Sequence, residues 1–114
     1  MSTTEIDLAT WPRREALALF RRFQKPQYSV TARLDISAIL ARKAREPGFS
    51  SYLACVHAAG AALHGVPELR CRIRGASVVI HDRLRLSPTL QLPDGRLGFT
   101  YLDWQPDFAA SGPF

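Results

Sequence analysis

Cysteine is scarce in this chain, and its spacing excludes several kinds of site. Two cysteines, Cys55 and Cys71, are too few for a disulfide framework. No C-x-x-C pair occurs, which argues against a zinc finger or a thiol redox centre. Free thiols are typical of a reducing compartment, so we expect a cytoplasmic protein.

Long hydrophobic runs are also missing. No apolar stretch is long enough to span a bilayer. The opening segment, MSTTEIDLAT, is polar and lacks the basic region and apolar run of a signal peptide. We therefore expect neither a membrane anchor nor secretory targeting.

Positive charge is present but is not concentrated in one place. The net charge is +5 over 114 residues, yet no Lys/Arg run between Arg13 and Arg96 is longer than a pair. Because nucleic-acid-binding surfaces need clustered cations, we expect no nucleic-acid partner. A hydrophobic content of 46% with 22% charged residues is typical of a globular protein, and the length suits one domain over residues 1–114.

The common catalytic signatures G-x-S-x-G, G-x-x-x-x-G-K and G-x-G-x-x-G do not occur. His57 and His64 share one face of a predicted helix with Cys55 nearby, but no further ligand has useful spacing. We therefore expect no metal site and predict structural roles for both histidines. Aromatic side chains from Phe20 to Trp104 indicate a core or, alternatively, an apolar ligand pocket.

Hydrophobic periodicity predicts helices followed by strands. Thr10 is expected to cap a first helix, with Pro12 in its first turn and its end near Arg22. Alternation of apolar and polar residues predicts a half-buried strand over Tyr28–Asp35. Further expected elements are helices over Ile36–Arg45, after an Asp35 cap, and Tyr52–Leu63, after a Ser50 or Ser51 cap, and strands over Leu69–Ile73, Ser77–Ile80, Leu86–Leu92 and Leu97–Asp103. This order predicts an α+β fold with a mixed or antiparallel sheet and helices packed on it.

Two of the predicted helices need contacts from elsewhere in the fold. The third helix has no formally charged residue at neutral pH, which predicts that it is buried on nearly all sides. On the first helix, Arg13 projects onto an arc that should face a core, and a buried guanidinium is costly without an acceptor. The apolar members of this arc are Ala16, Leu17, Leu19, Phe20 and Phe23.

A resemblance to a known family rests on Trp11-Pro12-Arg13-Arg14-Glu15-Ala16-Leu17, then Leu34-Asp35-Ile36-Ser37, and then Pro67-Glu68-Leu69-Arg70 with the strands around Ser77–Asp82 and Leu97–Asp103. These residues resemble the N-terminal part of the chloramphenicol acetyltransferase family, and the resemblance covers nearly the whole chain at the family's element spacing. The resemblance implies a homotrimeric O-acetyltransferase that moves acetyl from acetyl-CoA to a hydroxyl of chloramphenicol or another small acceptor. The family's catalytic His-His-x-x-x-Asp-Gly motif and its oxyanion serine do not occur here. The chain therefore resembles the N-terminal portion of the family's domain, which makes it an incomplete domain. We expect it to be inactive alone. The alternative is a non-catalytic relative that binds a ligand or assembles with a partner.

The resemblance also suggests roles for individual residues. Arg13 matches an arginine that pairs with the Asp of the missing catalytic motif. Here it must find another carboxylate, point into solvent, or meet an Asp from a second polypeptide. The positions that match the family's acceptor pocket are Leu19, Phe20, Gln24, Pro26, Tyr28, Phe99 and Tyr101. Gln24 and Pro26 depart from chloramphenicol-specific members, so the implied acceptor need not be chloramphenicol.

Overall fold

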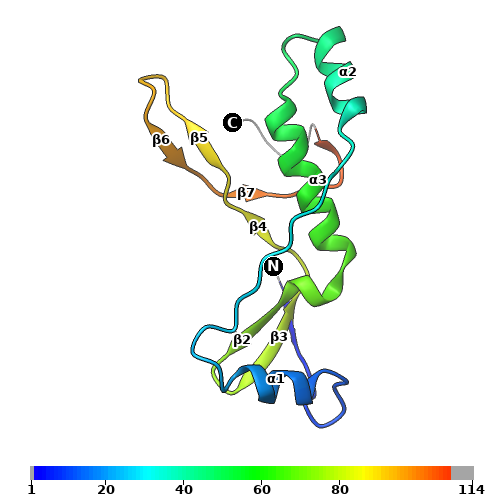
Figure 1. The fold of residues 1–114 in the computed structure, drawn as a ribbon, viewed down its shortest axis with the longest axis vertical. Coiled ribbons are helices and arrows are strands. Elements are labelled where there is room, and N and C mark those ends of the chain that lie inside the picture. Colours follow the sequence, from blue (N-terminus) through cyan, green and yellow to red (C-terminus); the bar gives the residue numbers. More distant parts are fainter. Residues whose placement is uncertain (1, 109–114) are drawn as a thin grey trace.

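The fold was analysed in a computed structural model that describes residues 2–108 (Figure 1). Within these residues one short strand is followed by three α-helices and one 3₁₀ helix, η1, and then by a run of short strands, which is an α+β arrangement as predicted. The elements are β1 (Thr3–Glu5), α1 (Arg14–Phe20), α2 (Ser37–Arg45), α3 (Ser51–Gly65), η1 (Pro67–Arg70), β2 (Cys71–Arg74), β3 (Ser77–His81), β4 (Arg85–Leu86), β5 (Thr89–Gln91), β6 (Leu97–Phe99) and β7 (Leu102–Asp103).

The strands form three small sheets rather than one continuous sheet. Their orders are β1-β3-β2, β4-β7 and β5-β6, and each pairing within residues 2–108 is antiparallel. Two tight turns close hairpins as the sequence predicted: Gly75 has φ 61° between β2 and β3, and Gly95 has φ 84° between β5 and β6. Such positive φ values favour glycine, because glycine has no Cβ that would collide with the backbone in this conformation. The β5–β6 hairpin stands out from the rest of the molecule as an arm (Figure 1).

The helical pair α2–α3 forms the opposite end of the molecule from α1 (Figure 1). Ser50 caps α3 as predicted, because its Oγ accepts a hydrogen bond from the Leu53 backbone N–H at 3.2 Å. Asp35 Oδ1 accepts from the Ser37 N–H at 2.9 Å, where α2 begins. The expectation that α3 is buried on nearly all sides is wrong. Gly60 is its one buried residue, because α2 and the strand end near Trp104 cover only part of the helix surface.

The start of α1 differs from the prediction. Thr10 does not cap the helix; its backbone N–H instead donates to the Asp7 carbonyl in a turn. The helix begins at Arg14, after Pro12, and its C-terminal end lies beside the β2–β3 turn, where Arg21 Nη2 donates to the Gly75 carbonyl at 3.1 Å. The helix therefore begins three residues, or nearly one turn, later than a cap at Thr10 would place it.

The predicted strand over Tyr28–Asp35 is also wrong. Residues 24–36 form an open segment that runs past β4 and α3 from α1 to α2, without regular secondary structure (Figure 1). A strand exists only when a neighbour takes up its backbone N–H and C=O groups, and no other part of residues 2–108 lies in that position.

The core is correspondingly small. Its buried apolar residues are Val78, Val79 and Leu102, on β3 and β7. The molecule is elongated, with principal extents of 52 × 30 × 29 Å. Many large apolar side chains are exposed, among them Leu97, Phe99 and Tyr101. No helix within residues 2–108 has the length and apolar character needed to cross a membrane.

Candidate functional site

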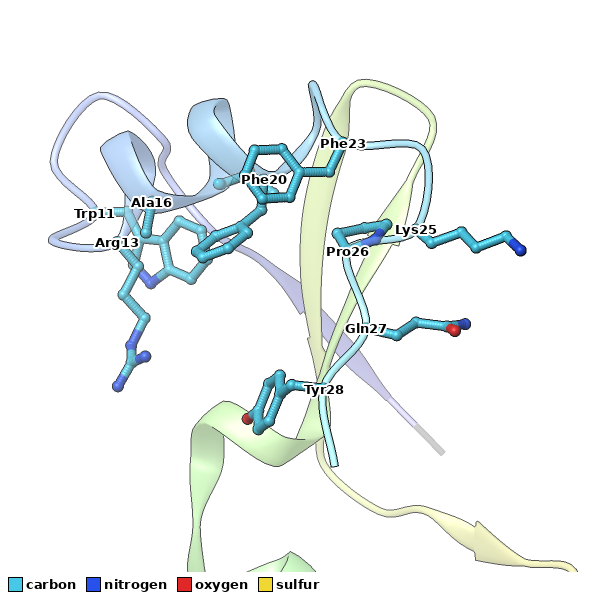
Figure 2. Close-up of a pocket in the computed structure, with 10 residues that line it drawn as sticks. Trp11, Arg13, Ala16, Phe20, Phe23, Lys25, Pro26, Gln27 and Tyr28 are labelled. Atoms are coloured by element: carbon cyan, nitrogen blue, oxygen red, sulfur yellow. The ribbon is translucent and has the colours of Figure 1, made fainter. Parts of the chain in front are cut away.

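An apolar groove of about 550 Å³ lies between α1 and the segment that follows it (Figure 2). α1 ends at Phe20, and a turn and bend over residues 21–24 bring the next residues back opposite the helix. The lining residues come from the turn before α1, from α1 and from this returning segment: Trp11, Arg13, Ala16, Leu17, Phe20, Phe23, Lys25, Pro26, Gln27 and Tyr28.

The apolar arc of α1 faces this groove, not a core. Phe20 and Phe23 make an edge-to-face contact with ring centroids 5.3 Å apart, and both rings remain half-exposed. The sequence assigned these residues to one face correctly, but their expected core is not formed by residues 2–108. The groove therefore presents aromatic surface to any molecule that enters it.

Polar groups lie at the rim of the groove. Figure 2 shows Arg13 and Tyr28 extending on one side, while Lys25 and Gln27 point away on the other. Arg13 Nη2 lies 3.8 Å from Glu68 Oε1, and the two side chains are 61% and 50% exposed. The contact is longer than a hydrogen bond, so Arg13 finds a carboxylate but is held only loosely. The arrangement suits a small, largely apolar molecule with a polar group directed toward Arg13 and the Tyr28 hydroxyl.

The residues expected to bind the acceptor do not all meet here. Phe20, Pro26 and Tyr28 line the groove, whereas Leu19 and Gln24 are outside its lining. Phe99 ends β6 and Tyr101 follows it, so both belong to the arm that extends away from α1 (Figure 1). Trp11, Phe23, Lys25 and Gln27 line the groove without having been proposed for it. Of these, Phe23 had a signal in the sequence, since it lies on the same helical arc as Phe20.

Both helical histidines have structural partners, as the sequence predicted. Trp104 stacks on His57 and on His64, with ring centroids 5.3 and 4.5 Å apart. Trp104 Nε1 donates to the His57 carbonyl at 2.9 Å, and His57 Nε2 donates to the Gln105 carbonyl at 2.8 Å. We call His57, Gly60, His64 and Trp104 the tryptophan lock, because they join the end of β7 to α3.

The contacts of His64 assign its tautomer. The Leu84 backbone N–H donates to His64 Nε2 at 3.1 Å, so this nitrogen carries no proton. Nδ1 then carries the proton and donates to the Gly60 carbonyl at 2.7 Å. Within residues 2–108, no group of three or more His, Cys, Asp or Glu residues is arranged to hold a metal ion.

Comparison with known proteins gives one family. The profile described as chloramphenicol acetyltransferase matches residues 1–95. Two curated relatives named chloramphenicol acetyltransferase 2 align over 83 residues: one from Escherichia coli is 35% identical and one from Haemophilus influenzae is 32% identical. In each case the alignment covers 73% of this chain and 38% of the relative. The chain therefore spans well under half the length of the curated relatives it matches.

A solved structure described as chloramphenicol acetyltransferase has the same fold. It matches with a TM-score of 0.87 at 28% sequence identity, over 96% of this chain and 52% of the solved chain. The agreement extends over nearly all of the open arrangement described above. On the family profile and on this structure, the chain belongs to the chloramphenicol acetyltransferase family.

Proposed function

We propose that this chain forms the acceptor-binding portion of an acetyl-CoA-dependent O-acetyltransferase. The observation that supports the proposal best is the aromatic groove beside α1, in a chain that belongs to the chloramphenicol acetyltransferase family. The acceptor is a small molecule with an apolar, planar part and a hydroxyl group; chloramphenicol is one candidate. Phe20, Pro26 and Tyr28 hold its apolar part. Phe99 and Tyr101 lie on the arm that extends away from α1, so within one chain they are given no part in this groove.

The groove positions an acceptor but supplies no general base. No histidine lines it, and the sequence has no His-His-x-x-x-Asp-Gly motif. A general base typically contributes about 10²–10⁴-fold to the rate of such a transfer. We therefore propose that residues 1–114 are inactive alone, and that a part of the enzyme outside these residues supplies the base together with an Asp that pairs with Arg13. Arg13 is then a positioning residue, because it holds the catalytic segment without touching the reacting hydroxyl.

Acetyl-CoA is the acetyl donor in this proposal, but the groove does not fit its diphosphate. The lining is mainly apolar, and its two cations, Arg13 and Lys25, extend to opposite sides (Figure 2). A diphosphate requires converging donors. The proposal therefore assigns the coenzyme site to the completing part of a cytoplasmic, homotrimeric enzyme, with residues 1–114 contributing one part of each domain.

The proposal is tested by acetyl transfer in two arms. The chain is assayed alone and after mixing with the separately expressed remainder of the Escherichia coli relative, with acetyl-CoA and chloramphenicol, and free thiol is measured. We expect turnover only in the mixture. Turnover by the chain alone at enzyme-like rates contradicts the proposed inactivity, and silence in both arms with folded chains contradicts the proposed function.

Variants of the groove locate the acceptor within the active mixture. Phe20→Ala should raise the KM for the acceptor by about tenfold, since about 1.5–3 kcal/mol of apolar burial is lost. Leu69→Ala is the matched control, because Leu69 is similarly exposed but does not line the groove. An equal KM for both variants would show that the groove does not bind the acceptor.

A non-catalytic ligand-binding module is the second candidate. The observation in its favour is that the groove is lined by residues 11–28 alone, so it needs no second polypeptide to exist. This candidate predicts that the isolated chain binds chloramphenicol or another aromatic acceptor, detected by quenching of Trp11 fluorescence in a Trp104→Phe background, while the mixture stays inactive.

A further inference from the structure

His64 joins α3 to both strands at the base of the arm. Leu84, whose backbone N–H donates to His64 Nε2 at 3.1 Å, comes directly before β4. Trp104, which stacks on the His64 ring with centroids 4.5 Å apart and planes 16° from parallel, comes directly after β7. β4 leads into the arm, β7 leads out of it, and the two strands pair with each other (Figure 1). One imidazole therefore holds the entry and the exit of the arm against the same helix.

The ring of His64 can hold both contacts only while it is neutral. Nδ1 donates its proton to the Gly60 carbonyl at 2.7 Å, so Nε2 keeps the lone pair that accepts from Leu84. An imidazolium carries a proton on each nitrogen and has no acceptor in either orientation of the ring. Protonation would therefore place two N–H donors against each other and leave the Leu84 N–H without its partner. The stack on Trp104 needs no lone pair and is favourable for a cation as well.

The charged groups around the ring do not stabilise an imidazolium by a direct contact. Within residues 2–108, the nitrogens of the His64 ring bond to backbone groups and to no carboxylate. Arg70 Nη1 donates to the His64 carbonyl at 3.1 Å, so a cation lies beside this end of the helix. The other charged or titratable side chains near Leu84 and Trp104 are Asp82, Arg83, Arg85, Asp103 and His57. The two carboxylates among them already accept hydrogen bonds, from Ser2 and from Arg85.

We propose that His64 is a pH-sensitive switch, which holds the start of β4 on α3 while its ring is neutral and releases it when the ring takes up a proton. An imidazole ordinarily gains its proton between about pH 7 and pH 5. The bond to Leu84 is present above that range and is lost as the pH falls through it. β7 stays on the helix through Trp104, so the acid form loses one of two attachments and the arm gains freedom at its base. The inference concerns the arm and does not depend on the acceptor assignment.

The first experiment follows the full chain by NMR. At about pH 7.5, the nitrogen shifts of the His64 ring should show the Nδ1–H tautomer. At about pH 5, the protection factor of the Leu84 amide, which corrects for the pH dependence of exchange itself, should be lower by about tenfold or more. The indole N–H of Trp104, which donates to the His57 carbonyl, should stay protected. An Nε2–H tautomer at the higher pH overturns the proposal, as does Leu84 protection that is absent or is the same at both pH values.

His64→Gln separates protonation of this ring from other effects of acid. A glutamine side chain reaches the position of Nε2 and offers an amide oxygen that accepts from Leu84 without titrating. The Leu84 amide of this variant should have the same protection factor at both pH values. His81→Gln is the matched control, because His81 contributes its backbone to the β1–β3 pairing and should leave the tenfold change intact. An equal change in His64→Gln and the wild type assigns the effect to another group and overturns the proposal.

Two checks keep the result specific to His64. Asp82 stays ionised over this range, because a hydrogen bond from the Ser2 hydroxyl lowers its pKa below the ordinary 3.8. The fold of His64→Gln is verified by the near-ultraviolet circular dichroism of Trp104 at about pH 7.5. If that signal is lost, the tautomer and the Leu84 protection of the wild-type chain decide the proposal without the variant.

Discussion

The tryptophan lock is closed within this chain, whereas the segment Tyr28–Leu34 is open. In the lock, Trp104 stacks on two imidazoles, lies over Gly60 and donates to a helix carbonyl. In the open segment, Val30 and its neighbours contact solvent and have no backbone partners within residues 2–108. Burial therefore depends on whether the partner surface belongs to the same chain, and not on the hydrophobicity of the segment.

This comparison makes a prediction about the lock that has the largest expected effect. A Cβ on Gly60 would lie 2.3 Å from Trp104 Cδ1 and 2.8 Å from Trp104 Nε1. The indole is held by two stacking partners and a hydrogen bond, so it cannot move aside cheaply. Gly60→Ala should lower the free energy of unfolding by about 3 kcal/mol, measured by urea denaturation with tryptophan fluorescence.

Gly65→Ala is the matched control for Gly60→Ala. Gly65 lies in the same helix, and an added Cβ meets nothing within 4 Å. Alanine is the better helix former by up to about 1 kcal/mol, so this variant should be neutral or slightly stabilising. Equal destabilisation by both variants would show that helix flexibility, rather than close contact with Trp104, requires glycine at position 60.

The same substitution on the buried strand β3 and in the open segment should have very different effects. Val78 is 2% exposed on the central strand β3, whereas Val30 is 78% exposed in the segment Tyr28–Leu34. Val78→Ala should cost about 2 kcal/mol, from lost burial and a residual cavity. Val30→Ala should change the free energy of unfolding by less than about 0.5 kcal/mol in the isolated chain. A cost at Val30 similar to that at Val78 would mean that the segment is packed in solution and is not open.

The sequence predicted best those features that depend on neighbouring residues. The Ser50 cap, the glycine turns at Gly75 and Gly95, and the shared face of His57 and His64 all need only short-range geometry. The strand at Tyr28–Asp35 failed because pairing depends on a distant partner, which periodicity cannot supply.

The groove was predictable only in part, for the same reason. Phe20 and Tyr28 were expected from the family resemblance, but their meeting depends on the path of the chain after Pro26. Nothing in the periodicity distinguished a helical face that lines a groove from one that enters a core. The arm carrying Phe99 and Tyr101 projects away from the groove, and its direction depends on the isolated β5–β6 pairing.

Acidification should loosen the N-terminal strand through Asp82. The Ser2 hydroxyl and backbone N–H donate to Asp82, and this lowers the pKa of Asp82 below its ordinary value of 3.8. A lowered pKa means that the contribution is fully present above the ordinary value and is lost as the pH falls through the lowered one. NMR shifts of β1 amides should therefore change below about pH 4. Asp82→Asn should remove most of this pH dependence, because the amide cannot lose or gain the proton.

The smallest expected effect on stability concerns the contact between Arg13 and Glu68. The nearest atoms of Arg13 and Glu68 are 3.8 Å apart, and the two side chains are 61% and 50% exposed. Water therefore screens the pair. Glu68→Gln should therefore change the free energy of unfolding of the isolated chain by less than about 0.5 kcal/mol. In the active mixture, Arg13→Ala should lower kcat, while Glu68→Gln should leave kcat unchanged and Arg13→Lys should restore it only partly, because a lysine cannot make a two-pronged pair with a carboxylate. If Glu68→Gln lowers kcat as much as Arg13→Ala, then Glu68 is the functional partner of Arg13 and no further carboxylate is needed.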